Sequence, residues 1–186
     1  MKKAGLILLL FLSVFLLYGG EEDDLRFIVG LYKDSNFSLA RTELISFIKN
    51  YPESSHLNTA KFLLANIYQD SAKYQDAIKL FKELEQGGAD PKIKPDIYFG
   101  LGQCYFLSND LKTSENYLRL FTLESPNHRL VGKAFYYLSR ICYQKENYTA
   151  ALKYLERVDE KEQDWAYKIA KIQVLSALDM NSEAEA

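Results

Sequence analysis

The sequence predicts an all-α fold, an α-solenoid in which helix-turn-helix repeats stack one after another. Two observations carry this prediction. Apolar residues recur at spacings of three and four, which is the period of amphipathic helices rather than of strands. The same kinds of residue return every 37 positions along the chain of 186 residues, with no insertion or deletion. Each return marks one pair of helices.

Four aligned copies define the repeat, at residues 24–56, 57–93, 94–130 and 131–167. Mostly large apolar residues fill four of its columns and small residues fill a fifth. The large columns hold Leu31, Tyr68, Tyr105 and Cys142; Phe37, Tyr74, Leu111 and Tyr148; Leu44, Phe81, Leu118 and Leu155; and Phe47, Leu84, Phe121 and Val158, while the small column holds Ala40, Ala77, Ser114 and Ala151. Five columns in one frame are strong evidence for a repeat array.

The second copy shows where the helices of a repeat begin and end. We expect its first helix over Leu57–Asp70 and its second over Tyr74–Gln86. Gly87 and Gly88 can end the second helix, because glycine adopts the left-handed conformation of a C-cap. The last residues, NSEAEA, resemble the start of a second helix in a fifth copy. That beginning would leave an uncovered edge.

Small residues in both helices have a packing cause. Ala65, Gly102 and Ser139 stand in the middle of the first helix, opposite the small column of the second helix. Helix axes approach to about 8 Å only where small side chains meet. A change of Ala77 to Leu should therefore overpack the contact. The first copy differs, because Ile28 stands where a small residue is expected.

Residues 1–20 have the layout of a secretory signal peptide. Lys2 and Lys3 precede an apolar run over residues 4–18, and Gly19 and Gly20 follow it. The run is shorter than the roughly 20 residues of a spanning helix. We expect a cleaved signal and export across the inner membrane, with a retained N-terminal anchor as the alternative. Residues 21–186 then form the repeat array.

Charge and cysteine content narrow the class of protein further. Without residues 1–20 the chain carries 21 basic and 25 acidic side chains, a net charge of −4. This balance argues against a nucleic-acid partner. Cys104 and Cys142 are the only cysteines, too few for a disulfide-built scaffold, and we expect both to be buried between repeats.

The sequence offers little that could perform catalysis. His56 and His128 both fall in turns between repeats, without neighbouring cysteines or paired carboxylates that would make a zinc site. Phosphate-binding glycine loops and nucleophile elbows are absent from the sequence. We expect no catalytic residue, metal, cofactor or small-molecule substrate.

The residues Leu64, Ala65, Tyr68, Ala77 and Phe81, and again Leu101, Gly102, Tyr105, Ser114, Leu118 and Pro126, resemble the pattern of the tetratricopeptide repeat family. The resemblance covers residues 24–186 and implies a right-handed superhelix. The turn at Tyr51–Ser54, in a chain led by a signal, is similar to that of the periplasmic branch. That branch includes the outer-membrane-assembly lipoprotein (BamD) and the Tol-Pal-associated cell-division coordinator. The chain lacks an N-terminal lipidation cysteine, which the lipoprotein would need.

In this family the first helices of the repeats line the concave surface, where partners bind. The resemblance thus points to the exposed columns of the first helices as the binding site. The residues we select for partner binding are Phe62, Asn66, Phe99, Gln103, Phe106, Tyr136, Arg140 and Tyr143. Aromatic and amide side chains together suit an extended or helical peptide. The alternative is that Phe62 and Phe99 pack against the neighbouring repeat and are not free.

The main expectation is a non-enzymatic scaffold of the bacterial cell envelope, probably not the best-known members of its branch but one that grips a segment of another protein. Two alternatives stay open. The chain could be a structural protein that self-associates through its C-terminal edge, or the N-terminal repeat region of a longer enzyme.

Overall fold

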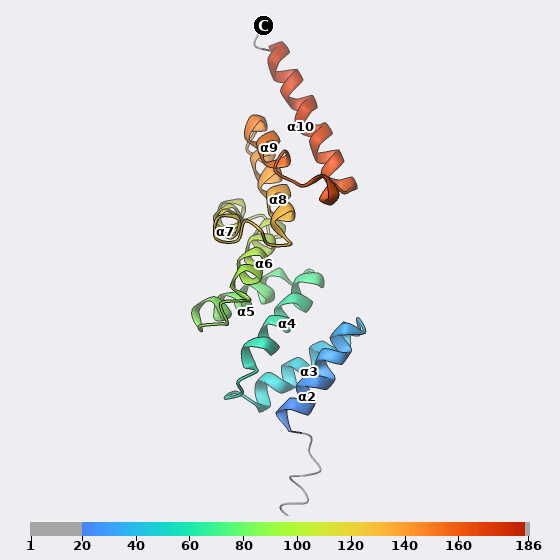
Figure 1. Cartoon of the computed structure of the whole chain (residues 1–186), viewed down its shortest axis with the longest axis vertical. Helices are drawn as coiled ribbons and strands as arrows, with labels where there is room; N and C mark the ends of the chain where they lie inside the picture. Colours follow the sequence, from blue (N-terminus) through green and yellow to red (C-terminus); the bar gives the residue numbers. More distant parts are fainter. Residues whose placement is uncertain (1–19, 185–186) are drawn as a thin grey trace, which may run out of the picture. The chain divides into compact units, whose positions relative to one another are not determined.

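The computed structural model describes residues 20–184, and over this range the chain is all-helical (Figure 1). The helices are α2 (Glu21–Lys33), α3 (Phe37–Asn50), α4 (Leu57–Asp70), α5 (Tyr74–Gln86), α6 (Lys94–Leu107), α7 (Leu111–Glu124), α8 (Val131–Gln144), α9 (Tyr148–Leu155) and α10 (Trp165–Ala184), with a 3-10 turn η1 (Glu160–Glu162) before α10. The all-α prediction is confirmed. The residues form two compact units, divided between Ile67 and Tyr68.

The limits of the helices repeat with the period of the sequence. First helices α4, α6 and α8 begin at residues 57, 94 and 131, and α2, α4, α6 and α8 end at 33, 70, 107 and 144. Second helices α3, α5, α7 and α9 begin at 37, 74, 111 and 148. Successive limits are thus 37 residues apart. The limits expected for the second copy, Leu57–Asp70 and Tyr74–Gln86, are confirmed residue for residue.

Each first helix turns into its second helix through the same backbone motif. A residue with positive φ follows the helix in every copy, namely Ser35, Ala72, Asn109 and Glu146, with φ between 58° and 66°. In the second copy the Ala72 N–H donates to the Gln69 carbonyl, and the Lys73 N–H donates to the Tyr68 carbonyl. The other three copies have the same two bonds. This is the Schellman motif, here built without glycine.

The second helices begin with different caps. The Asp110 carboxylate accepts a hydrogen bond from the Thr113 N–H, and the Asn147 side chain accepts one from the Ala150 N–H, both at 3.1 Å. Such caps satisfy N–H groups that the first turn leaves without a helical partner. The bond from the Thr113 N–H also lowers the pKa of the Asp110 carboxyl.

The N-terminal unit, residues 20–67, has its core where α2 packs on α3. Ile28 from α2 is buried there together with Ala40, Leu44 and Phe47 from α3. The Tyr51 hydroxyl, just after α3, donates a 2.7 Å hydrogen bond to the Asp24 carboxylate. That bond fastens the end of α3 to the start of α2. Ile28, which departs from the small-residue rule, is a core residue and is only 2% exposed.

In the C-terminal unit, residues 68–184, every helix from α5 to α10 packs against the helix that follows it. First helices also contact one another, α6 with α8 and α8 with α10. The buried residues at these contacts include Phe81, Leu84, Ile97, Leu101, Leu118, Phe121, Leu138, Ile141, Leu155 and Val174. The structure thus has the neighbour-on-neighbour packing of a solenoid.

Two glycines of α6 allow the neighbouring second helices to approach closely. A Cβ on Gly100 would lie 2.7 Å from the Phe81 ring of α5, and a Cβ on Gly102 would lie 2.7 Å from the Leu118 side chain of α7. Gly102 therefore acts as the small residue that the sequence analysis assigns to the contact within the repeat. Gly100 has the corresponding part toward the preceding repeat.

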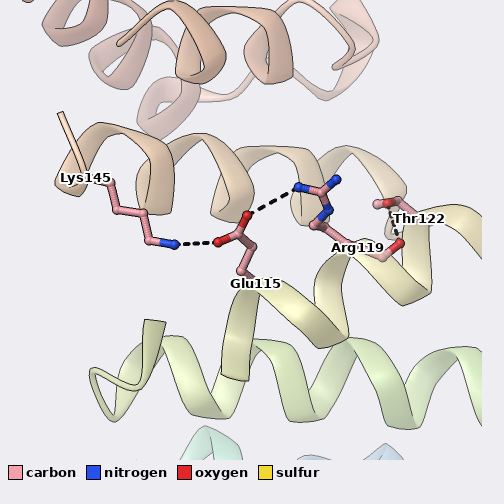
Figure 2. A network of polar contacts seen from close by, with 4 residues as sticks. All are labelled: Glu115, Arg119, Thr122 and Lys145. Atoms are coloured by element: carbon pink, nitrogen blue, oxygen red, sulfur yellow. Dashed lines mark hydrogen bonds and ion pairs between the residues drawn. The ribbon is translucent and has the colours of Figure 1, made fainter. Parts of the chain in front are cut away.

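A surface network ties the third repeat to the end of α8 (Figure 2). The Glu115 carboxylate of α7 accepts hydrogen bonds from Lys145, at 2.5 Å, and from Arg119, at 3.4 Å. The Thr122 hydroxyl donates to the Arg119 carbonyl. Lys145 above all holds the pKa of the Glu115 carboxyl below its usual range. All four side chains meet solvent, so the pairs add little to stability and mainly fix orientation.

Two further expectations meet the structure here. Both Cys104 and Cys142 are buried and unpaired, as the repeat columns predict. The residues 181–184 of NSEAEA continue α10 instead of starting a second helix. The expected signal segment, residues 1–20, lies outside the described residues except for Gly20. Among the helices described, none is both long and apolar enough to span a membrane.

Candidate protein-binding face

The first helices α6, α8 and α10 lie in a row in the C-terminal unit, because α8 contacts both of the others. Side chains from one side of this row form a continuous set of polar and aromatic contacts. We call this set the first-helix face: Gln69, Gln103, Phe106, Tyr136, Tyr137, Arg140, Tyr143 and Gln173. The residue Gln69 comes from the last turn of α4, on the C-terminal side of the division.

A chain of amide hydrogen bonds runs across the first helices. The Gln69 Nε2 donates to Gln103 Oε1 at 2.9 Å, and the Gln103 Nε2 donates to the Tyr137 hydroxyl at 2.9 Å. The three residues come from α4, α6 and α8, so one bond joins each helix to the next. Burial raises the pKa of the Tyr137 hydroxyl, which stays protonated at neutral pH. These bonds fix the side chains before any partner arrives.

Aromatic rings flank this chain of amides. The Phe106 ring lies 5.0 Å from the Tyr137 ring, and the Tyr136 ring meets Tyr137 edge-on at 5.6 Å. Tyr143 packs against Tyr148 at 5.4 Å. Phe106, Tyr136 and Tyr143 are all half-buried. Half-buried rings held by their neighbours offer apolar area that costs little conformational entropy on binding.

Arg140 supplies the cation of the face. Its guanidinium donates to the Gln173 side chain of α10 at 2.8 Å and lies 5.9 Å from the centre of the Tyr143 ring. No carboxylate is paired with it among the contacts of the described residues. An arginine that is oriented but not neutralised can bind a carboxylate or a backbone carbonyl of a ligand.

A cavity of about 440 Å³ adjoins the face near the start of α8 and α10. Tyr136 and Tyr137 line it on one side, with Tyr167 and Val158 at other walls and Arg129 and Lys133 among its polar residues. Arg129 is engaged by the Asp96 carboxylate at 2.9 Å. The cavity is therefore mostly apolar with a basic rim, and it has room for a side chain of a bound peptide.

Most residues selected from the sequence are brought together on this face. Gln103, Phe106, Tyr136, Arg140 and Tyr143 all contribute side chains to it. Phe62 and Asn66 lie on α4 in the N-terminal unit, and the structure does not join them to the face. These assignments rest on geometry, and binding itself remains a prediction.

Phe99 is placed in the core. Only 6% of its surface is exposed, and its ring packs on Phe121 at 5.6 Å and on Tyr137 at 6.3 Å. Of the two interpretations open at the sequence level, packing against the neighbouring repeat is thus the one that the structure shows. Phe99 is a support beneath Tyr137 and is not available to a partner.

Sequence reasoning missed Gln69, Tyr137 and Gln173. Gln69 stands in the same repeat column as Phe106 and Tyr143, so the column could have included it. Gln173 stands in the column of Tyr136, one repeat later. Tyr137 follows Tyr136 directly, and its part in the amide chain depends on side-chain reach that spacing alone does not reveal.

The histidines do not form a catalytic group in the described part of the chain. His128 packs against the Phe121 ring at 5.3 Å and lies 3.6 Å from the Asp96 carboxylate. His56 is half-buried at the start of α4, in the N-terminal unit. Between residues 20 and 184, no three acidic, histidine or cysteine side chains gather as metal ligands would.

A sequence comparison now decides the kind of repeat. The model of the tetratricopeptide repeat matches residues 62–121, from α4 to α7. The chain contains tetratricopeptide repeats. Helical pairs 37 residues apart extend this pattern on both sides of the matched segment, from α2 to α9. A search of curated protein sequences finds no match.

Solved structures show the same fold. A tetratricopeptide repeat protein from Parabacteroides merdae superposes with a TM-score of 0.69 at 16% identity, over 89% of this chain. The chain spans 62% of the length of that protein. The nearly identical TPR-like repeats assigned to a kinesin light chain of Podosopora anserina give 0.63 at 13% identity, covering 88% of this chain and 89% of that one. The MamA protein gives 0.62 at 14% identity, with coverage of 86% and 88%.

These likenesses establish the fold of a tetratricopeptide repeat array. Tetratricopeptide repeats are protein-binding scaffolds, and no catalytic family matches the chain. At identities of 12–16% the structures carry no information on which partner is bound.

Proposed function

We propose that the protein is a non-enzymatic scaffold of the bacterial cell envelope that binds a segment of a partner protein on its first-helix face. The observation that supports this most directly is the chain of bonds Gln69–Gln103–Tyr137 beside half-buried rings. It gives a surface whose side chains are already ordered. A preformed surface loses little entropy on binding, which favours capture of a flexible segment.

The chemistry of the face suggests what the segment contains. Phe106, Tyr136 and Tyr143 provide apolar area, and the cavity beside Tyr136 provides room for one inserted side chain. Arg140, oriented by Gln173, favours an acidic side chain or a main-chain carbonyl. An extended or helical segment with an aromatic or aliphatic anchor close to an acidic residue fits these features.

Localisation is part of the proposal and is supported by the sequence pattern of residues 1–20. Two lysines, an apolar run and a pair of glycines are the layout of an export signal. Export places the scaffold in the periplasm, where the branch with the outer-membrane-assembly lipoprotein and the Tol-Pal-associated coordinator works. The mass of the protein purified from cells tests this point, because removal of a signal shortens the chain at its N-terminus.

Binding is tested with a double variant on the face. Tyr136→Ala with Arg140→Ala removes a ring and the cation while leaving the buried core untouched. Capture of the partner from an envelope extract should be lost, with helical content by circular dichroism unchanged. The control is Leu123→Ala, because Leu123 is 80% exposed on α7, a second helix. Equal capture by both variants would rule out this face as the binding site.

A further inference from the structure

The last helix exposes a row of large apolar residues. Trp165, Ile169, Ile172 and Leu175 of α10 are 76%, 44%, 68% and 42% exposed. Spacings of four, three and three place them along one side of the helix. We call this side the outer face of α10. The opposite side is different, because Tyr167, Ala170 and Val174 are buried against the rest of the unit. Exposed apolar rows of this size mark interaction sites.

The repeat shows what normally covers such a face. The position of Ile172 is held by Tyr98 in α6 and by Phe135 in α8, at intervals of 37 residues. The Tyr98 ring lies 6.1 Å from the Tyr117 ring of α7, and the Phe135 ring lies 6.3 Å from the Tyr154 ring of α9. In two successive repeats, this first-helix residue therefore packs on an aromatic residue of the second helix.

The other positions of the outer face follow the same rule. The equivalents of Leu175 are Leu101 and Leu138, which are 0% and 1% exposed. The equivalents of the exposed Ser176 are Gly102 and Ser139, and both are buried. Within residues 20–184, α10 has packing partners on its inner side only, in α8 and α9. The outer face is thus the surface that a second helix covers in the preceding repeats.

We propose that the outer face of α10 binds an amphipathic helix of a partner protein, in the place that α9 occupies on α8. The established α6–α7 interface gives the chemistry of this helix. There Ser114 lies against Gly102, with its hydroxyl bonded to the Gly102 carbonyl at 2.7 Å. Tyr117, Leu118 and Phe121 follow at three, four and seven residues. The partner helix carries a small residue followed by large apolar residues at these intervals.

A second copy of α10 fits this place less well. The outer face carries large residues at Trp165, Ile169 and Ile172, and a facing copy would set these against their equivalents. Close approach of two helices needs small side chains where the axes cross. The exposed Ser176 is the small residue on the α10 side, and a small residue on the partner completes the contact. The repeat thus points to a helix of second-helix type.

The single tryptophan of the chain makes the proposal directly measurable. Trp165 is the only tryptophan in the sequence and belongs to the outer face. The probe is a synthetic peptide with the sequence of residues 110–124, which lacks tryptophan and contains Ser114, Tyr117, Leu118 and Phe121. Titrating this peptide into the protein should shift the Trp165 emission to shorter wavelength in a saturable manner. The shift reports removal of the indole from water.

Matched variants make the titration specific. Ile172→Asp should weaken peptide binding at least about tenfold, because a central apolar anchor is lost. Leu123→Asp alters an equally exposed leucine on α7 and should leave binding unchanged. A peptide with Leu in place of Ser114 should fail to bind, because the small residue at the crossing is gone.

Three results would overturn the proposal. The first is a Trp165 emission that does not change at millimolar peptide. The second is binding that Ile172→Asp leaves intact, since the peptide would then sit elsewhere. The third is a protein that self-associates in sedimentation equilibrium and becomes monomeric on Ile172→Asp, because a second copy would then cover the face.

Discussion

The hydroxyl of Ser114 donates a hydrogen bond of 2.7 Å to the main-chain carbonyl of Gly102, across the contact between α7 and α6. The bond joins the two small residues that let these helices approach. It shows that the small columns are a packing device, because both residues are buried and each leaves room for the other helix. Stability of the array should therefore depend on volume at these positions.

Gly102→Ala tests that dependence. The added Cβ would lie 2.7 Å from Cγ and Cδ2 of Leu118 and 3.3 Å from its main-chain nitrogen, so helix α7 would have to shift. We expect a loss of about 1–3 kcal/mol in the free energy of unfolding, measured by urea denaturation. Gly30→Ala in α2 is the control, because no atom lies within 4 Å of its Cβ, and it should gain about 0.5–1 kcal/mol. Equal effects at the two glycines would contradict the packing account.

Ser139→Ala should stabilise the protein. The Ser139 hydroxyl is buried with no hydrogen-bond partner among the described residues, unlike the hydroxyl of Ser114. Removing an unsatisfied hydroxyl is expected to raise the free energy of unfolding, by up to about 1 kcal/mol. Ser114→Ala should lower it by about 0.5–1.5 kcal/mol, since a buried bond is lost. A larger loss from Ser139→Ala than from Ser114→Ala would show that the Ser139 hydroxyl has a partner.

Ala72→Gly should also stabilise the protein. Ala72 adopts φ 58° in the Schellman turn after α4, where an L-residue with a Cβ is strained. Relief of this strain exceeds the added freedom of the unfolded chain, and we expect a gain of about 0.5 kcal/mol. Ala177→Gly, within the helix α10, should instead cost about 1 kcal/mol. Thermal or urea unfolding of both variants measures the difference, and the same sign at both positions would refute the argument.

Both thiols should be unreactive in the folded protein. Burial raises the pKa of Cys104 to about 12 and also raises that of Cys142. At pH 8 the reactive thiolate of Cys104 is therefore scarce, and its access is blocked as well. An aromatic disulfide reagent should modify neither residue until urea unfolds the chain, when both react. Fast modification of the native protein would place a cysteine at the surface.

The sequence predicted helix limits well where the repeat is regular. Leu57–Asp70 and Tyr74–Gln86 are clear from spacing because the same columns recur in every copy. The α10 helix departs from that pattern beyond residue 180, where no complete further copy supports the frame. The positive φ of Ala72 and Glu146 was also out of reach, because neither residue type favours it.

The site was only partly predictable for a different reason. Phe99 and Gln103 are one helical turn apart, and the sequence pattern placed both on the open side. The structure buries Phe99 beneath Tyr137 and leaves Gln103 half-buried in the amide chain. Spacing gives the direction of a side chain to within a fraction of a turn, which does not separate a ring under the face from one on it.

Site-specific photo-crosslinking tests the central claim most directly. A photoreactive phenylalanine analogue replaces Tyr136 or Tyr143 on the first-helix face, and replaces the exposed Leu123 of α7 as the control. After irradiation in the native cells, we predict an adduct with the same partner protein from positions 136 and 143 and none from position 123. Adducts from position 123 alone, or none from either face position, would contradict the claim that partners bind along the first helices.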